Sequence, residues 1–600
     1  MAATAVAGAL IAAFTSSAAP TGTGWIDLLE RALAVALVAV AASRARRWSL
    51  VFGSVLVTAG APWPLLLGGL GALGGTVFLV ETRVRSRVLG SLVGVAVALV
   101  SLGLEVPGPV GMETLLALTA TVPILVSGYR RSTSPARSVV KRVALVVVCA
   151  AGLAVLLTGI AAVLSVADVS DAVAATEEAV DVATAGEGGE SAALFASAGE
   201  SFRAADSAVG SWWASGTRLI PLLGANLAAV QRSVSAGVDL TSAGEELVSG
   251  AEFSEVQLEG GGVDLVALEA LQPRVTAAGE ALASARSTLD GAESAWLVGP
   301  LADRLATVQD RLAETSDNAD NAVVAVDGLP AVLGADAPRR YLFLFGNPAE
   351  SRDMGGHIGN WAELVADGGR IELVEVGGPL DLASPELSET FLDTLPASFA
   401  TMDPARNPQN LGATPDLPVA MDAAAQLLEQ RTSRPVDGVV YADVGAFAAM
   451  LGLVGPVEVP GLPGFELDED NAVEFLTRDQ YILFDSPDAS GDALEEVIST
   501  VFDRLTSTKL AGPDALGATF APLVEAGRFQ FMTYHDEDVE MLEHFSLDGA
   551  VPTPEGHDVL GVFNRNAGPS KIDSYLERDV ASLIRWDPDS GAVASTVWVA

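Results

Sequence analysis

The chain has 600 residues, of which 50% are hydrophobic, and its formal net charge is −42. Several domains are expected at this length, and so acidic a chain is a poor partner for nucleic acid or anionic lipid. The single cysteine, Cys149, excludes an intrachain disulfide and a cysteine-based metal site.

The charge is distributed unevenly along the chain. Residues 1–142 contain 12 basic and 5 acidic residues, whereas the remainder contains 22 basic and 71 acidic residues. A basic, apolar front followed by an acidic back predicts a membrane module joined to a water-exposed module.

Seven apolar runs precede residue 167, at about 4–19, 28–43, 49–62, 65–81, 88–104, 112–128 and 143–166. The last run carries no charge and is long enough to cross ~30 Å of hydrocarbon. The first is rich in alanine and resembles a signal peptide, but it lacks a basic start, which favours a helix. These runs predict a polytopic membrane domain over 1–166 with about seven helices, a count that is open by one or two.

Arginine clusters lie in alternate connections between these runs. Because basic residues concentrate on the cytoplasmic side of membranes, this pattern predicts a cytoplasmic N-terminus. Residues 167–600 are then expected to be extracytoplasmic.

Residues 167–335 are rich in Ala, Ser, Glu and Asp and follow a helical period. One predicted seam, with steps of three and four residues, consists of Phe195, Ala198, Phe202, Ala205, Val209 and Trp212. Narrow seams of this kind suit helices that pack on one another. The sequence predicts a helical stalk or bundle here, with a sensor-like helical domain as the alternative.

From residue 336 the pattern changes to strands that alternate with helices. Strands are predicted at 341–345, 361–366, 370–376, 436–443 and 456–460, and helices at 417–431, 446–455 and 492–507. Asp367-Gly368-Gly369 is the predicted hairpin turn between the second and third strands. This order predicts a mixed α/β domain over 336–600.

Further strands are predicted at the end of the sequence. They cover 557–566 and parts of 574–600, with a turn at Asp587–Gly591. Because the last residues still follow a strand pattern, we expect the α/β domain to be truncated at its C-terminal end.

The stretch NPAESRDMGGHIGNWAELVADGG, residues 347–369, contains the main candidate site. Glu350, Arg352, Gly355 and Gly356 are the candidate ligand-binding residues: Arg352 could clamp an anionic group while Gly355-Gly356 brings backbone N–H groups close to it. The alternative is a structural pair of Glu350 and Arg352 that fixes the loop, with glycines required by the backbone. His357 is expected to be a scaffold residue.

This stretch resembles the signature of a bacterial family of unknown function, the domain-of-unknown-function family 4012. The matching residues are Asn347, Glu350, Arg352, Gly355, Gly356, Ile358, Gly359 and the turn at 367–369. The segments 414–421, 435–461 and 561–580 support the resemblance, which covers roughly 190–600. It implies an envelope protein of actinobacterial or other bacterial type, without an established activity.

A remoter likeness is to LytR-CpsA-Psr proteins, which transfer glycopolymers from a polyprenyl-pyrophosphate carrier to the cell wall. This resemblance implies that Arg352 lies in a pyrophosphate-binding turn, with Asp381, Asp403 and Arg406 as further candidates and Mg²⁺ as the cofactor. The acidic segment FDSPDASGDALEEV, residues 484–497, would repel a pyrophosphate unless Mg²⁺ intervened. No other metal site is expected.

The sequence therefore predicts a membrane-anchored cell-envelope protein whose extracytoplasmic domain binds or organises an envelope component. The alternative is a Mg²⁺-dependent transferase that moves a lipid-pyrophosphate-linked glycopolymer to the cell wall. The expected partners are the lipid bilayer and a polyprenyl-linked glycan or cell-wall polymer, and not nucleic acid.

Overall fold

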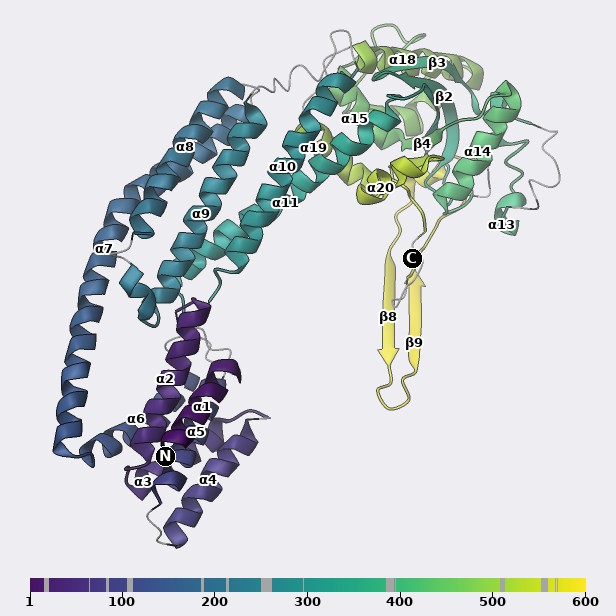
Figure 1. Cartoon of the computed structure of the whole chain (residues 1–600). Coiled ribbons are helices and arrows are strands. Elements are labelled where there is room, and N and C mark those ends of the chain that lie inside the picture. The colour runs from purple at the N-terminus through teal and green to yellow at the C-terminus, as the bar shows by residue number, and fades with distance from the viewer. Residues whose placement is uncertain are drawn as a thin grey trace. The chain divides into compact units, whose positions relative to one another are not determined.

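The computed structural model describes the chain except for residues 16–20, 64, 83–85, 105–111, 185–187, 212–214, 250–261, 295, 385–392, 394, 508–512, 552–558, 567 and 569. The chain divides into two compact units. Unit 1 comprises Met1–Ala251 and Thr276–Ala319, and unit 2 comprises Glu252–Val275 and Asp320–Ala600. The described chain is mostly helical, with one small mixed sheet in unit 2 (Figure 1).

Unit 1 begins with helices at the positions of the predicted apolar runs. They are α1 (Ala2–Thr15), α2 (Gly24–Ala42), α3 (Arg47–Gly60), α4 (Leu66–Glu81), α5 (Arg87–Gly103), α6 (Met112–Arg130) and the long α7 (Ser134–Thr184). Small side chains let several of them approach closely. A Cβ on Gly94, for example, would lie 2.4 Å from the Cβ of Ala42.

The predicted transmembrane bundle is wrong. In the described part of the chain only Ser134–Leu157 is both long and apolar enough to cross a membrane. Helices α1, α3, α4 and α5 contain 14 to 17 residues. At 1.5 Å per residue they fall short of the ~20 residues that ~30 Å of hydrocarbon requires. The apolar runs located the helices correctly, but a multi-pass topology does not follow from them.

The predicted helical region follows α7. It contains α8 (Gly188–Val209), the 3₁₀ turn η1 (Ser215–Leu219), α9 (Leu223–Val248), α10 (Leu265–Asp290) and α11 (Gly299–Val332). The seam from Phe195 to Val209 is buried as predicted, while Trp212 lies outside the described residues. Phe202 packs with Ala172 of α7 and Val234 of α9, so α8 joins its two neighbours through narrow apolar contacts.

Unit 2 contains a five-stranded sheet with the order β3-β2-β1-β4-β7. Its strands are β1 (Arg339–Asn347), β2 (His357–Asp367), β3 (Arg370–Gly377), β4 (Gly438–Asp443) and β7 (Phe529–Thr533). Strands β1 and β4 are parallel, and the other neighbouring pairs are antiparallel. The predicted hairpin turn joins β2 to β3, with positive φ at both Gly368 and Gly369.

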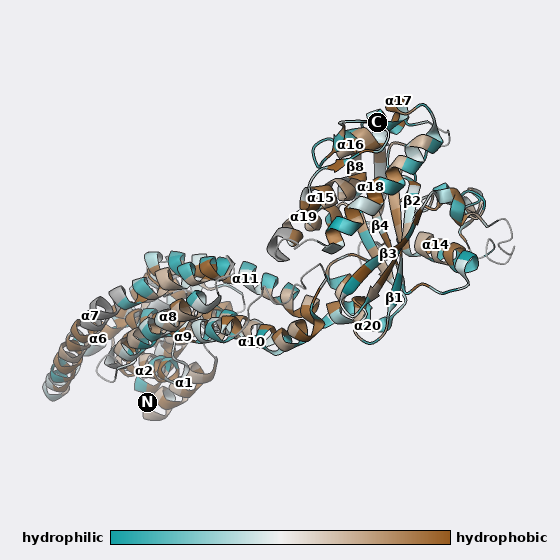
Figure 2. Ribbon diagram, turned by 90° about the horizontal axis from the view of Figure 1, so that it is seen from above, coloured by the Kyte–Doolittle hydropathy of each residue, from teal (hydrophilic) through white to brown (hydrophobic). Residues whose placement is uncertain are grey.

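Helices cover both faces of this sheet. Helix α14 (Leu417–Thr432) packs on one face against Leu342, Leu344 and Trp361. Helices α15 (Val444–Val454) and α18 (Pro487–Ser507) pack on the other against Phe343 and Phe345. Strand β1 is buried on both faces, and its middle part, Tyr341–Phe345, is an uninterrupted apolar run, as expected for such a strand. Figure 2 shows hydrophobic residues along the central strands.

Shorter elements complete unit 2. They are η3 (Pro379–Leu382), α13 (Ala397–Ala400), η4 (Pro408–Asn410), β5 (Val457–Glu458), β6 (Glu466–Leu467), α16 (Ala472–Glu474), the π-helical turn η5 (Phe475–Asp479), α17 (Gln480–Leu483), α19 (Pro513–Glu525), α20 (Asp536–His544) and η6 (Ile572–Tyr575). Of these, η3, η5 and α17 lie near the sheet edge at which β1 and β4 end.

The C-terminal strand predictions have mixed outcomes. Residues 559–566 have no regular structure, so the predicted strand is wrong there, and 557–558 lie outside the described residues. Strands β8 (Val580–Trp586) and β9 (Val593–Val599) form the expected hairpin. All of their side chains are exposed.

Candidate functional site

The candidate loop leaves the sheet where β1 ends. The carboxamide of Asn347 donates to the Leu476 carbonyl (2.8 Å) and accepts from the Ala349 amide (3.0 Å). The Asn347 carbonyl also lies 3.1 Å from Nδ1 of His357, at the start of β2. Asn347 therefore ties both ends of the loop to η5.

Both glycines of the Gly-Gly step are required by close approach. Gly355 has a φ of +146°, and a Cβ there would lie 2.6 Å from the buried hydroxyl of Tyr441. A Cβ on Gly356 would lie 2.1 Å from the Asn347 carbonyl oxygen. Contacts this short do not occur, so a side chain at either position would displace the loop. The step packs the loop against β4.

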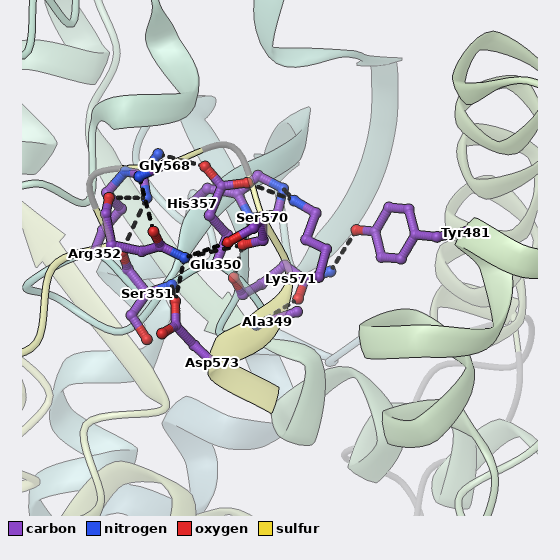
Figure 3. Close-up of polar contacts among 12 residues, drawn as sticks. Ala349, Glu350, Ser351, Arg352, His357, Tyr481, Gly568, Ser570, Lys571 and Asp573 are labelled. Atoms are coloured by element: carbon purple, nitrogen blue, oxygen red, sulfur yellow. Dashed lines mark hydrogen bonds and ion pairs between the residues drawn. The ribbon is translucent and has the colours of Figure 1, made fainter. Parts of the chain in front are cut away.

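Glu350 and Arg352 form an ion pair inside this loop (Figure 3). Nη2 of Arg352 lies 2.7 Å from Oε1 of Glu350. The rest of the guanidinium donates to Oδ1 of Asn410 and to the carbonyls of Ser351 and Asn566. Arg352 is 6% exposed, and its guanidinium is engaged by the protein on every nitrogen.

Lys571, which lies 221 positions after Glu350 in the sequence, completes the cluster. Its Nζ lies 2.8 Å from Oε2 of Glu350 and 3.3 Å from Nε2 of His357, and it sits over the Tyr481 ring (Figure 3). With Nδ1 of His357 donating to the Asn347 carbonyl, Nε2 is left to accept from the ammonium. Glu350 thus receives one cation on each oxygen.

The electrostatics follow from this arrangement. Burial alone would raise the pKa of Glu350, but hydrogen bonds from Lys571 and Arg352 outweigh it and lower that pKa. Burial and the nearby charge of Lys571 lower the pKa of His357 to about 4. At neutral pH the cluster is therefore a carboxylate, two cations and a neutral imidazole.

The chain segment around Lys571 is attached to the loop by further contacts. The amide of Ser351 donates to Oδ2 of Asp573 (2.8 Å), and its carbonyl accepts from the Asn566 amide (2.9 Å). Arg565 forms an ion pair with Asp353. Arg565, Asn566, Lys571 and Asp573 thus attach this late segment of the chain to the loop. Lys571 is one of only three lysines in the chain, which is the one feature of the sequence that marks it.

The other predicted site residues lie in separate local arrangements. Asp381 accepts from the Gly378 amide (3.0 Å) within the turn η3. Asp403 forms an ion pair with Arg406 (3.3 Å) in an exposed loop. Ligand binding by the seven predicted residues stays a prediction.

The residues do not fit the Mg²⁺ site that the transferase likeness implies. In the described part of the chain, no group of three or more His, Cys, Asp or Glu side chains is arranged to hold a metal ion. Asp381 and Asp403 instead accept hydrogen bonds within their own turns. Mg²⁺ is commonly held by one or two carboxylates together with water and phosphate oxygens, whereas these two carboxylates are engaged within their own separate turns.

A cavity of about 660 Å³ lies beside the cluster, at the carboxyl ends of the parallel strands β1 and β4. Its apolar lining includes Phe345, Leu380, Val444, Phe447, Leu476, Phe484, Leu494 and Ile498. Its polar lining includes Asn347, His357, Asn360, Asp443, Gln480, Tyr481, Asp485, Asp488, Asp492 and Glu495. Open sheets bind ligands at this edge of parallel strands.

The ion cluster forms the outer support of one cavity wall. Asn347, His357 and Tyr481 line the cavity on one side, and two of them contact Lys571 on the other. Arg352 is not part of the lining. The cavity has no signal in the sequence, because its lining comes from five separate segments and no local pattern marks residues such as Gln480.

Comparison with protein families gives one match. Residues 336–481 match the model of the family described as protein of unknown function (DUF4012). The matched segment runs from just before β1 to Tyr481, so it contains the candidate loop and much of the cavity lining. It is shorter than the 190–600 expected from sequence, and the likeness to LytR-CpsA-Psr proteins stays a prediction. Neither the curated proteins nor the solved structures yield a match.

Proposed function

We propose that this chain is a membrane-anchored protein of the cell envelope whose unit 2 binds an amphipathic envelope component. The cavity at the ends of β1 and β4 is the observation that carries this proposal. Its volume of about 660 Å³ lies within the ~300–1,000 Å³ typical of ligand pockets.

The lining suits a molecule with an apolar part and a polar part. Phe345, Val444 and Phe447 come from the sheet and α15, and they offer an apolar wall. Asn360 and the acidic residues before and within α18 offer hydrogen-bonding groups. Burial of a hydrocarbon chain on such a wall contributes about 0.8 kcal/mol per CH₂ group.

The proposed membrane anchor is the segment Ser134–Leu157 of α7. Leu145 is 64% exposed and Val148 is 67% exposed, and none of the most apolar window is buried. Basic residues from Arg130 to Arg142 lie near its N-terminal end, and acidic residues follow from Asp168. By the positive-inside rule, residues 167–600 lie on the extracytoplasmic side.

The transferase alternative stays a prediction. It needs a cation-lined site for a pyrophosphate, whereas the guanidinium of Arg352 is used by Glu350, Asn410 and two carbonyls. In the described chain no observation favours it over binding.

Photochemical labelling of the full chain in liposomes tests the proposal. An uncharged alkyl probe carrying a diazirine is expected to label peptides within 476–498. Leu494→Trp fills the cavity and is expected to reduce this labelling severalfold. Val473→Trp adds the same side chain at a position 40% exposed and outside the lining, so labelling is expected to persist. Equal labelling of both variants would count against the cavity.

A further inference from the structure

Asn360 is a buried amide directed at the cavity. It lies opposite Phe345 in the β1–β2 register, on the sheet face that α18 covers, and it belongs to the cavity lining. The residue is 6% exposed. In the described part of the chain no hydrogen bond reaches its carboxamide. A ligand in the cavity can supply the hydrogen bonds that this carboxamide does not form within the described chain.

Acceptors dominate the rest of the polar lining. Asp485, Asp488, Asp492 and Glu495 line the cavity, and among the described residues none of them forms an ion pair. Burial raises the pKa of Glu495, and the carboxylates of Asp381 and Asp492 raise it further. The lining contains no lysine or arginine among the described residues. The lining carboxylate of Asp443 does form an ion pair within the described chain, with Arg528 (2.8 Å).

Such a lining discriminates between head groups. A phosphate ~4 Å from a carboxylate is repelled by about 1 kcal/mol even at the dielectric constant of water. An ammonium group is attracted, but it donates only, so the N–H groups of Asn360 would stay without acceptors. A hydroxyl group donates and accepts, so it can satisfy both the carboxylates and the amide.

We propose that the ligand's polar part is an uncharged polyol attached to its apolar chain, and that Asn360 and Glu495 determine this specificity. This inference rests on the proposed function. It names a sugar-like head group and excludes phosphate and pyrophosphate as the group held in this cavity.

The test uses three diazirine-bearing decyl probes with maltoside, trimethylammonium or phosphate head groups, on the full chain in liposomes. The maltoside is expected to label the cavity peptides at least tenfold more than the phosphate and severalfold more than the ammonium. Asn360→Leu is expected to lower maltoside labelling about tenfold, the loss of roughly one hydrogen bond to a buried group. Asn321→Leu makes the same change outside the cavity, and the labelling by all three probes is expected to stay as in the wild type.

Glu495→Gln gives a second, independent variant, because its side chain is only partly buried and the substitution keeps its size while removing its charge. It is expected to reduce the preference for maltoside over phosphate. Phosphate or ammonium labelling as strong as that of maltoside would overturn the inference and leave the proposed function standing. The same holds if Asn360→Leu and Glu495→Gln keep the wild-type preference. If none of the three probes labels the cavity peptides, both this inference and the proposed function are overturned.

Discussion

Nη2 of Arg352 lies 2.7 Å from Oε1 of Glu350 in the loop between β1 and β2, and the two side chains are 6% and 12% exposed. Lys571 occupies the second oxygen of Glu350. Glu350 and Arg352, which the sequence suggests as a ligand clamp, therefore connect the loop to residues distant in sequence, namely Asn410, Asn566 and Lys571. Their substitution should change stability before it changes binding.

Arg352→Ala is expected to destabilise unit 2 by about 3 kcal/mol, because it leaves a buried carboxylate with one cation and removes three further hydrogen bonds. The thermal transition of unit 2, followed by hydrogen exchange of β1 and β4, measures this loss without any ligand. Arg406→Ala is the matched control, since its pair with Asp403 is exposed, and less than about 1 kcal/mol is expected. Equal effects of the two variants would contradict the structural role.

Gly355→Ala is expected to cost about 2 kcal/mol, from a backbone conformation that L-residues avoid and from contact with the Tyr441 hydroxyl. Tyr441→Phe removes that hydroxyl, so the double variant should recover part of the loss. Gly356→Ala meets a backbone carbonyl, and Tyr441→Phe should not rescue it. A double-mutant cycle on thermal unfolding measures the difference; additive effects for Gly355 would be inconsistent with the contact.

The stability of unit 2 should fall as the pH falls from about 6.5 to 4. The folded pKa of His357 is lowered to about 4, so in this window the unfolded chain binds more protons than the folded one. Below this range the lowered pKa of Glu350 adds a further loss, as its carboxylate is protonated. The contribution of His357 is on the order of 3 kcal/mol.

His357→Gln should flatten this dependence between pH 6.5 and 4, as measured by unfolding midpoints. His544→Gln, on α20, changes a histidine outside the cluster and serves as the control. An unchanged pH dependence in His357→Gln would show that the imidazole is not the group responsible.

Charges placed in the proposed anchor should release the protein from membranes. Val148→Asp with Leu153→Asp costs about 2.5–3.5 kcal/mol per residue at the centre of a spanning helix. Fractionation is expected to move the variant from the membrane pellet to the supernatant. Val173→Asp with Val180→Asp, farther along α7, should leave the protein in the pellet.

The sequence predicted the strands and helices of unit 2 better than it predicted the contacts of the candidate site. Alternating and continuous apolar patterns marked β1 to β4 and α14 correctly, because such patterns directly reflect burial. The same logic failed in residues 1–166, where apolar helices pack on one another and most are too short to span a bilayer. The pairing of Glu350 with Lys571, 221 positions away, depends on tertiary structure and has no local signal.

The most direct test of the central claim is the identity of molecules that co-purify with the full chain from its own membranes. Native mass spectrometry of the wild type is expected to show one bound amphiphile per chain, with a hydrocarbon part and an uncharged polyol part. Leu494→Trp should lose it, and Val473→Trp should keep it. Retention of the same amphiphile by Leu494→Trp, or its absence from the wild type, would contradict the account.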